Sequence, residues 1–249
     1  MLLFKKKHLL HFARMYFGVL FLFYCINFLG FYAESESVVM KVHALFALIC
    51  SILVIIGLVN RIVYGILLLF CWFYIGNVTV EQALLNNLTF WFFVINVPGL
   101  KLDNGIKLLG FQGNPILLWL PVLNDACYHF LSSIQKFSDD AWIHGFGMFA
   151  TFNLPWMAML PLSVYTFLPE TLQLFLNYGA MLLQALILPL MLFRYTSWVA
   201  ILFIFIFYIT LIYPARLDLI GQLGLVYCLF ALSSNHNNGF KNFAYIFKK

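Results

Sequence analysis

Residues 1–31 read MLLFKKKHLLHFARMYFGVLFLFYCINFLGF, a short basic segment followed by an apolar run from Phe12 to Phe31. A secretory signal peptide has the same order, but its apolar core covers only about 7–15 residues and ends at a small-residue cleavage site. The run in this chain is longer, and no such site follows it. We therefore expect an uncleaved first transmembrane helix, and with it a fold built in the lipid bilayer.

The composition of the whole chain agrees with a membrane fold. Of its 249 residues, 64% are hydrophobic and only 9% are charged, whereas soluble domains are about 25% charged. The mean hydropathy is +0.95. We expect an all-α protein with one transmembrane domain over residues 1–249. Its predicted parts are a basic cytoplasmic N-terminus at 1–11, a helical bundle at 12–232, and a polar, basic tail at 233–249.

Apolar runs bounded by charges or turn residues predict about eight membrane spans. Their ranges are 12–31, 42–59, 62–78, 83–97, 115–134, 171–192, 195–213 and 217–232. The segment 141–166 is also apolar, but it contains Pro155 and Pro161. Because proline breaks the hydrogen-bond ladder inside a helix, we expect this segment to be re-entrant or interfacial rather than a straight span.

The lysines in the short connections predict the orientation of the spans, because such residues remain on the cytoplasmic side. The run Lys5–Lys7 places the N-terminus in the cytoplasm. The span 115–134 then carries the chain outward, which puts Lys136 at the outer face, and the basic tail returns inside. We expect a multi-pass protein of the inner or plasma membrane, with the bilayer as its first partner.

Several classes of function find no support in the residues. The chain contains no GxSxG, Walker or dinucleotide-binding motif, so hydrolase, ATPase and nicotinamide chemistry are not indicated. Its basic residues gather at the two ends rather than on one face, which argues against nucleic acid as a partner. The five cysteines form no CxxC pair and all lie in apolar stretches. A disulfide-exchange enzyme is therefore not expected.

The candidate catalytic residues are Asp125, His129 and Lys136. Asp125 and His129 are spaced i, i+4 in the span 115–134 and share one face of its helix. Lys136 follows two turns later, near the same face if the helix continues. Ionisable residues in a span usually face the bundle interior or a watery cavity. The alternative is that Asp125 and His129 satisfy each other while Lys136 reaches the membrane surface.

The stretch SSIQKFSDDAWIHGFG, residues 132–147, is a polar island between two apolar segments. A metal site could be drawn from Asp125, His129 and His144. Their spacing matches neither HExxH nor paired CxxC motifs, so no metal is predicted. A second polar stretch, NVPGLKLDNG at residues 96–105, has the composition of a turn.

The order of several short motifs resembles the HTTM (horizontally transferred transmembrane) domain family, which includes the vitamin K-dependent gamma-carboxylase. The resemblance covers residues 12–232 and rests on four places. These are Arg14 at the start of the first span, Gly57 and Arg61 in ILVIIGLVNR, Asp103 in NVPGLKLD, and Tyr128, Lys136, Trp142 and Gly145 in YHFLSSIQKFSDDAWIHG.

The resemblance implies a role for Lys136. In the carboxylase, the lysine of this motif deprotonates reduced vitamin K and faces the lumen, which corresponds to the outside of a bacterium. It implies a quinone-like lipid as ligand or cofactor here. Tyr128, Trp142 and His144 are then the candidate substrate-binding residues around Lys136. A lysine acts as a base only if burial or a nearby cation lowers its pKa.

Two departures from the carboxylase argue against peptide carboxylation. A turn proline, Pro98, stands near the position of its catalytic histidine, and the 249 residues hold no counterpart of its large lumenal domain. Two other functions stay open. One is a non-enzymatic scaffold or maturation factor for a membrane or secreted protein. The other is a DoxX-like membrane subunit of a redox system, which the span end GLVNR also resembles. Whether the chain catalyses any reaction stays open too.

Overall fold

The structure, a computed structural model, describes residues 6–31, 37–75, 79–97, 115–153, 166–193, 195–212 and 218–233. All regular structure in these ranges is helical, so the predicted all-α class is confirmed for this part of the chain. Three helical segments are long and apolar enough to cross a membrane: Leu9–Phe31, Val38–Ile56 and Glu170–Leu192. They fit a membrane protein, while the count of eight spans stays a prediction.

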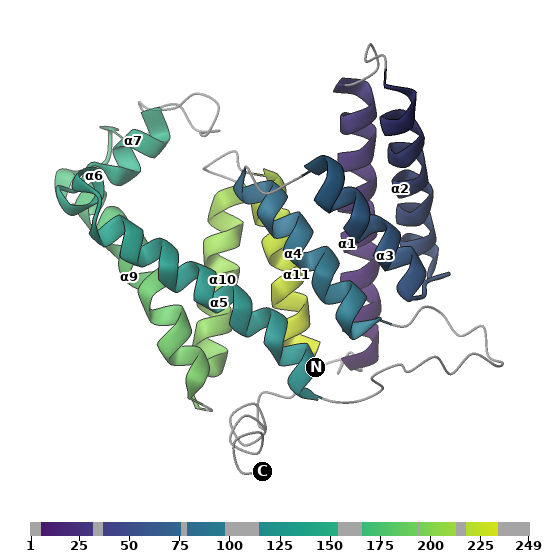
Figure 1. Ribbon diagram of the computed structural model, residues 1–249. Coiled ribbons are helices and arrows are strands. Elements are labelled where there is room, and N and C mark those ends of the chain that lie inside the picture. The colour runs from purple at the N-terminus through teal and green to yellow at the C-terminus, as the bar shows by residue number, and fades with distance from the viewer. Residues whose placement is uncertain are drawn as a thin grey trace. The chain divides into compact units, whose positions relative to one another are not determined.

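The chain divides into two compact units, residues 1–118 and 119–249. In the first unit, α1 packs against α2, α2 against α3, and α3 against α4 (Figure 1). The helices of this unit are α1 (Lys6–Phe31), α2 (Val38–Ile56), α3 (Arg61–Phe70), the π-helical turn η1 (Cys71–Ile75) and α4 (Val80–Ile95). Whether both units form one bundle, as the sequence predicts, stays a prediction.

Local capping residues set the ends of these helices. The hydroxyl of Ser37 accepts a backbone hydrogen bond at the start of α2, and Asn60 does the same for α3. Thr79 and Gln82 form a capping box at the start of α4. Gly57 adopts the left-handed conformation, with φ of 89°, and ends α2. The helix therefore stops before the predicted limit of residue 59.

The second unit contains the polar stretch 132–147. Its helices are α5 (Pro115–Phe137, which starts just before the unit boundary), α6 (Asp140–Ile143), α7 (Gly147–Asn153), α9 (Glu170–Leu192), α10 (Ser197–Ile212) and α11 (Asp218–Ser233). Helix α10 packs against α9 and α11. A Cβ atom on Gly221 would lie 2.6 Å from the carbonyl oxygen of Tyr208. Glycine at this position therefore lets α11 approach the backbone of α10.

The segment predicted to be interfacial, 141–166, begins as two short helices, α6 and α7. Figure 1 shows them at the end of the unit where α5 ends and α9 begins. Gly145, with φ of 84°, lies in the turn between them. The prolines Pro155 and Pro161 lie outside the described residues, as do Pro98 and Asp103.

Candidate functional site

The three candidate catalytic residues lie on α5, which continues three residues past the predicted span end and so keeps Lys136 in the helix. Asp125 is fully buried and His129 is 4% exposed, whereas Lys136 in the last turn is half-buried. Asp125 Oδ2 and His129 Nε2 are 3.6 Å apart. This distance suits an ion pair but exceeds that of a hydrogen bond. Neither atom has a hydrogen-bond partner among the described residues.

Gln184 of α9 lies between Lys136 and His129 and contacts both of them. Lys136 Nζ donates to Gln184 Oε1 at 2.7 Å and to Ser132 Oγ at 2.8 Å. Gln184 Nε2 lies 3.4 Å from His129 Nδ1. The glutamine is only 2% exposed. Lys136 and His129 therefore do not touch, as a simple cluster would require, but meet through one buried amide.

Tyr208 of α10 is the hydrogen-bond partner of Asp125. Its hydroxyl donates to Asp125 Oδ1 at 2.5 Å, and the tyrosine is 3% exposed. Phe207 packs its ring edge-to-face on His129 at 4.7 Å between centroids. The polar chain, as we call the series Lys136–Gln184–His129–Asp125–Tyr208, thus draws on three helices of the second unit. The rings of Phe207 and Tyr208 lie against His129 within this series.

The hydrogen-bonding capacity of each group fixes the direction of the polar chain. An ammonium group only donates, so the glutamine atom next to Lys136 is the oxygen. The amide nitrogen of Gln184 then faces His129 Nδ1, which must accept. The proton of a neutral His129 therefore sits on Nε2, the nitrogen that faces Asp125. A carboxylate beside an imidazole N–H is the arrangement that orients histidine bases in enzymes.

The surroundings of Lys136 make its ammonium group lose a proton more readily than a hydrated lysine does. Burial lowers its pKa from 10.5 to about 8, because an ammonium loses hydration when it is covered. A carboxylate close to the amine would oppose this shift, and two aspartates follow the helix. Neither Asp139 nor Asp140 forms an ion pair with Lys136 among the described residues, and both are exposed. Asp139 instead caps α6 by accepting from the backbone of Ala141 and Trp142.

Helices α6 and α7 hold an aromatic ring over the lysine. Lys136 Nζ lies 5.1 Å from the centre of the Trp142 ring, within cation–π range. Asn177 of α9 fixes this position, since its Nδ2 donates to the carbonyl of Trp142 at 2.9 Å and its Oδ1 accepts from Met148 N at 3.1 Å. A Cβ atom on Gly147 would lie 2.2 Å from the Trp142 ring, so only glycine leaves room for it.

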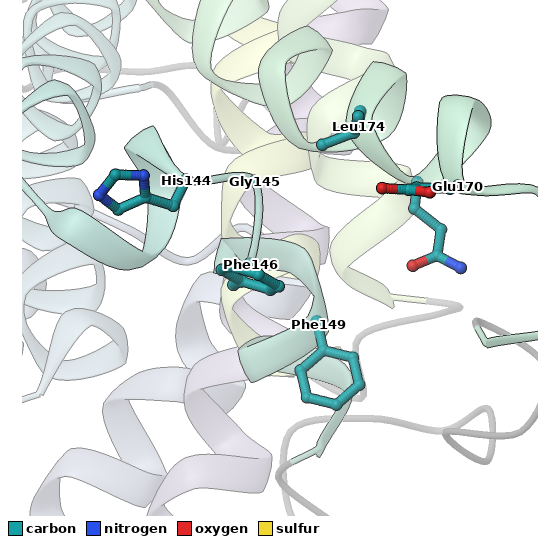
Figure 2. A pocket seen from close by; sticks show the side chains of 7 residues that line it. His144, Gly145, Phe146, Phe149, Glu170 and Leu174 are labelled. Carbon is teal, nitrogen blue, oxygen red and sulfur yellow. The ribbon is translucent and has the colours of Figure 1, made fainter.

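The other two candidate substrate-binding residues lie away from the polar chain. Tyr128 is 48% exposed on the outside of α5. His144 is exposed and borders a shallow pocket of about 320 Å³ beside Phe146 and Glu170. Figure 2 shows the His144 ring directed away from Glu170 in that view. No three His, Cys, Asp or Glu side chains meet in metal-binding geometry within the described ranges.

Sequence reasoning missed Gln184, Tyr208 and Asn177. A signal existed for two of them: Asn177 and Gln184 are amides seven residues apart in an apolar run, which puts them on one helix face. Buried polar residues in a span tend to face other helices. No comparable signal marks Tyr208, which is one of 13 tyrosines in the chain.

The first unit holds the remaining residues of the family resemblance. Arg14 is 1% exposed and donates from Nη1 to the carbonyl of Val54 at 2.7 Å, near the end of α2. Cations are favoured at this end of a helix. Arg61 is the first residue of α3, directly after its cap Asn60. The bond of Arg14 thus joins α1 to the last turns of α2.

Comparison of the chain with protein-family models, curated proteins and solved structures gives no match. The fold and site therefore define only a class: an all-helical protein with membrane-type helices and a buried polar chain in its second unit. Neither the HTTM resemblance nor a particular activity gains support from relatives.

Proposed function

We propose that the chain is a multi-pass membrane protein of HTTM type whose site around Lys136 binds the polar head of a lipophilic, quinone-like molecule. The observation that carries this proposal is the polar chain itself. Ionisable side chains in apolar helices are expensive to bury, and they usually mark a functional site. A chain that runs from a half-buried amine to a fully buried carboxylate suits proton handling better than passive packing.

The chemistry at Lys136 is that of an amine poised near neutral pH. With a pKa of about 8, roughly one tenth of the amine is unprotonated at pH 7. Two of its hydrogens are used by Ser132 and Gln184. The remaining position of Nζ is free for a ligand oxygen, or, in the neutral amine, for the proton of an acidic hydroxyl such as that of a quinol. This proton acceptance is the proposed reaction step.

The proposed topology puts this site within reach of such a molecule. Eight spans with a cytoplasmic N-terminus place Lys136 two residues past the end of span 115–134, at the outer membrane surface. Trp142 then covers the amine from above, and the ligand must displace or stack on that ring. Aromatic rings provide flat apolar surface for a quinone ring.

Ligand protection of Lys136 tests the proposal. Membranes containing the full chain are treated with an amine-acylating reagent at pH 8, with and without a short-chain ubiquinol, and acylation is followed by peptide mass spectrometry. At a quinol concentration ten times its Kd, acylation of Lys136 should be about tenfold slower, because only the unoccupied fraction reacts. Lys41 of α2, in the first unit, is the internal control and should react at an unchanged rate.

A second candidate function, a scaffold for a protein partner, is favoured by exposed aromatic residues near the same end of the unit. Phe146 is 61% exposed and Phe167 is 92% exposed. Clusters of exposed apolar side chains can mark a contact surface. The scaffold predicts that quinol leaves the acylation of Lys136 unchanged. That result, at quinol concentrations that saturate the membrane, would remove the ligand-binding proposal.

A further inference from the structure

Gln184 occupies the only bridge between Lys136 and His129 among the described residues. Its amide is 2% exposed, with the oxygen 2.7 Å from Lys136 Nζ and the nitrogen 3.4 Å from His129 Nδ1. An amide has one accepting end and one donating end. It cannot accept hydrogen bonds from both neighbours at once.

We propose that Gln184 is a positioning residue that makes Lys136 and His129 mutually exclusive proton carriers. With an ammonium at Lys136, the amide oxygen of Gln184 must face Lys136. The N–H of Gln184 then points at His129 Nδ1, the atom that would carry a second proton. Protonating His129 Nδ1 would set two donors against each other inside an apolar bundle, where an unmade hydrogen bond is costly. The amide would have to turn over first.

The turned amide is acceptable only when Lys136 is neutral. Its nitrogen then donates to the lone pair of Nζ, and its oxygen accepts from His129 Nδ1–H. One proton has left Nζ and one has arrived at Nδ1, so the charge of the pair is unchanged. Gln184 thus allows the arrangements Lys⁺ with neutral His, neutral Lys with His⁺, and both neutral. It excludes only the doubly protonated pair.

Among the described residues, Gln184 is the side chain that contacts both members of the pair. Lys136 faces Ser132 on α5 and the Trp142 ring on α6, besides Gln184. His129 faces Asp125 on its own helix, and Phe207 and Tyr208 of α10.

On the far side of Asp125, α10 contributes Tyr208, and α11 contributes Tyr227 and Cys228 within electrostatic range of the carboxylate. The carboxylate would attract a second proton to His129. A neutral His129 beside it would therefore point to the amide as the group that opposes this attraction.

The ¹⁵N NMR signals of the His129 ring test the proposal in the unliganded full chain, reconstituted in lipid nanodiscs with ¹⁵N-labelled histidine and assigned with His129→Gln. At pH 6, wild-type His129 should carry one proton, on Nε2. In Gln184→Met the ratio of imidazolium to imidazole should rise about tenfold, the equivalent of one buried hydrogen bond. Lys136→Met should raise it too, and the double variant should show less than the sum of both effects.

Gln184→Met separates this mechanism from charge repulsion, because it removes the amide and leaves the Lys136 charge in place. Repulsion alone predicts a change in Lys136→Met and none in Gln184→Met, which would overturn the proposal. Gln135→Met, at an exposed position of α5, is the matched control and should leave His129 unchanged.

If Gln184→Met does not fold, Gln184→Glu decides, because its carboxylate accepts from both neighbours and should produce imidazolium. Imidazolium at His129 together with an ammonium at Lys136 in the wild type at pH 6, the latter read from the signal of ¹⁵N-labelled lysine, would overturn the proposal. Neutral His129 in Gln184→Glu would overturn it as well. No ligand is used, so this result and the failure of quinol protection are independent.

Discussion

The two units of the chain bury polar side chains in different ways. In the first unit, Ser51 and Thr89 each donate to the carbonyl four residues earlier in their own helix, at 2.7 and 2.6 Å. Arg14 and Tyr64 reach backbone carbonyls elsewhere in the unit. Each of these four hydrogen bonds ends on a main-chain carbonyl, so none of them requires a polar partner side chain.

In the second unit, the polar chain depends on side chains from different helices. Asp125 needs Tyr208 of α10, and Lys136 needs Gln184 of α9. Each partner is itself polar and would be costly to bury alone. Backbone carbonyls are present wherever a helix is, whereas a series of matched side chains must be specified residue by residue. The polar chain of the second unit therefore has the organisation expected of the proposed site, whereas the four bonds of the first unit are of the kind that packing alone can explain.

The largest change in stability is expected in a pair of matched tyrosine variants, one in each unit. Tyr208→Phe leaves Asp125 Oδ1 buried without its donor, and hydrogen bonds to charged groups contribute about 1.5–3 kcal/mol. Tyr64→Phe removes a hydrogen bond of 3.3 Å to a backbone carbonyl. Such neutral contacts between membrane helices average about 0.6 kcal/mol. The free energy of unfolding, measured by detergent-induced denaturation, should fall clearly more in Tyr208→Phe.

Equal losses in the two variants would show that the carboxylate is no more dependent on its partner than a carbonyl is. The control for side-chain size is built into the pair, because both substitutions remove one hydroxyl from a buried ring.

Prediction from sequence succeeded where the physics is local. Apolar runs bounded by charges located the helices within a few residues, since lipid requires long apolar segments. The i, i+4 spacing located the Asp125–His129 pair on one face. Helix α2 ended early because the backbone at Gly57 is left-handed, which hydropathy does not register.

The partners of that pair could not be predicted, because they depend on how helices pack. Gln184 lies 55 residues from His129, and Tyr208 lies 83 residues from Asp125. No spacing rule connects such distances. The position of the Trp142 ring over Lys136 could not be predicted for a related reason. Asn177 of α9 holds Trp142 in place, and the local sequence of 141–153 does not contain that contact.

A smaller effect is expected at the Lys136 end of the polar chain, where burial lowers the pKa of the amine. Because the folded pKa of about 8 is below 10.5, the folded state holds its proton less tightly than the unfolded state. Lys136 therefore destabilises the fold below about pH 8, and this penalty disappears as the pH rises to 10.5. Trp142→Ala should hydrate the amine and raise the midpoint of its acylation by about one pH unit.

The measurement is the rate of Lys136 acylation against pH, in native membranes and in denatured protein. Trp72→Ala, at an exposed ring in the first unit, is the control and should leave the midpoint near 8. A midpoint of 10.5 already in the native wild type would mean that the amine is fully hydrated.

The smallest effect is predicted for Thr89→Val in the first unit. Valine keeps the shape of threonine and removes the hydroxyl that bonds to the carbonyl of Leu85. That carbonyl still accepts the backbone N–H of the helix, so nothing essential is left unpaired. The free energy of unfolding should change by less than about 0.5 kcal/mol. A loss as large as that of Tyr208→Phe would mean that Thr89 and its neighbour Cys71, 3.7 Å away, form a polar contact on which this unit depends, and the contrast between the two units would fail.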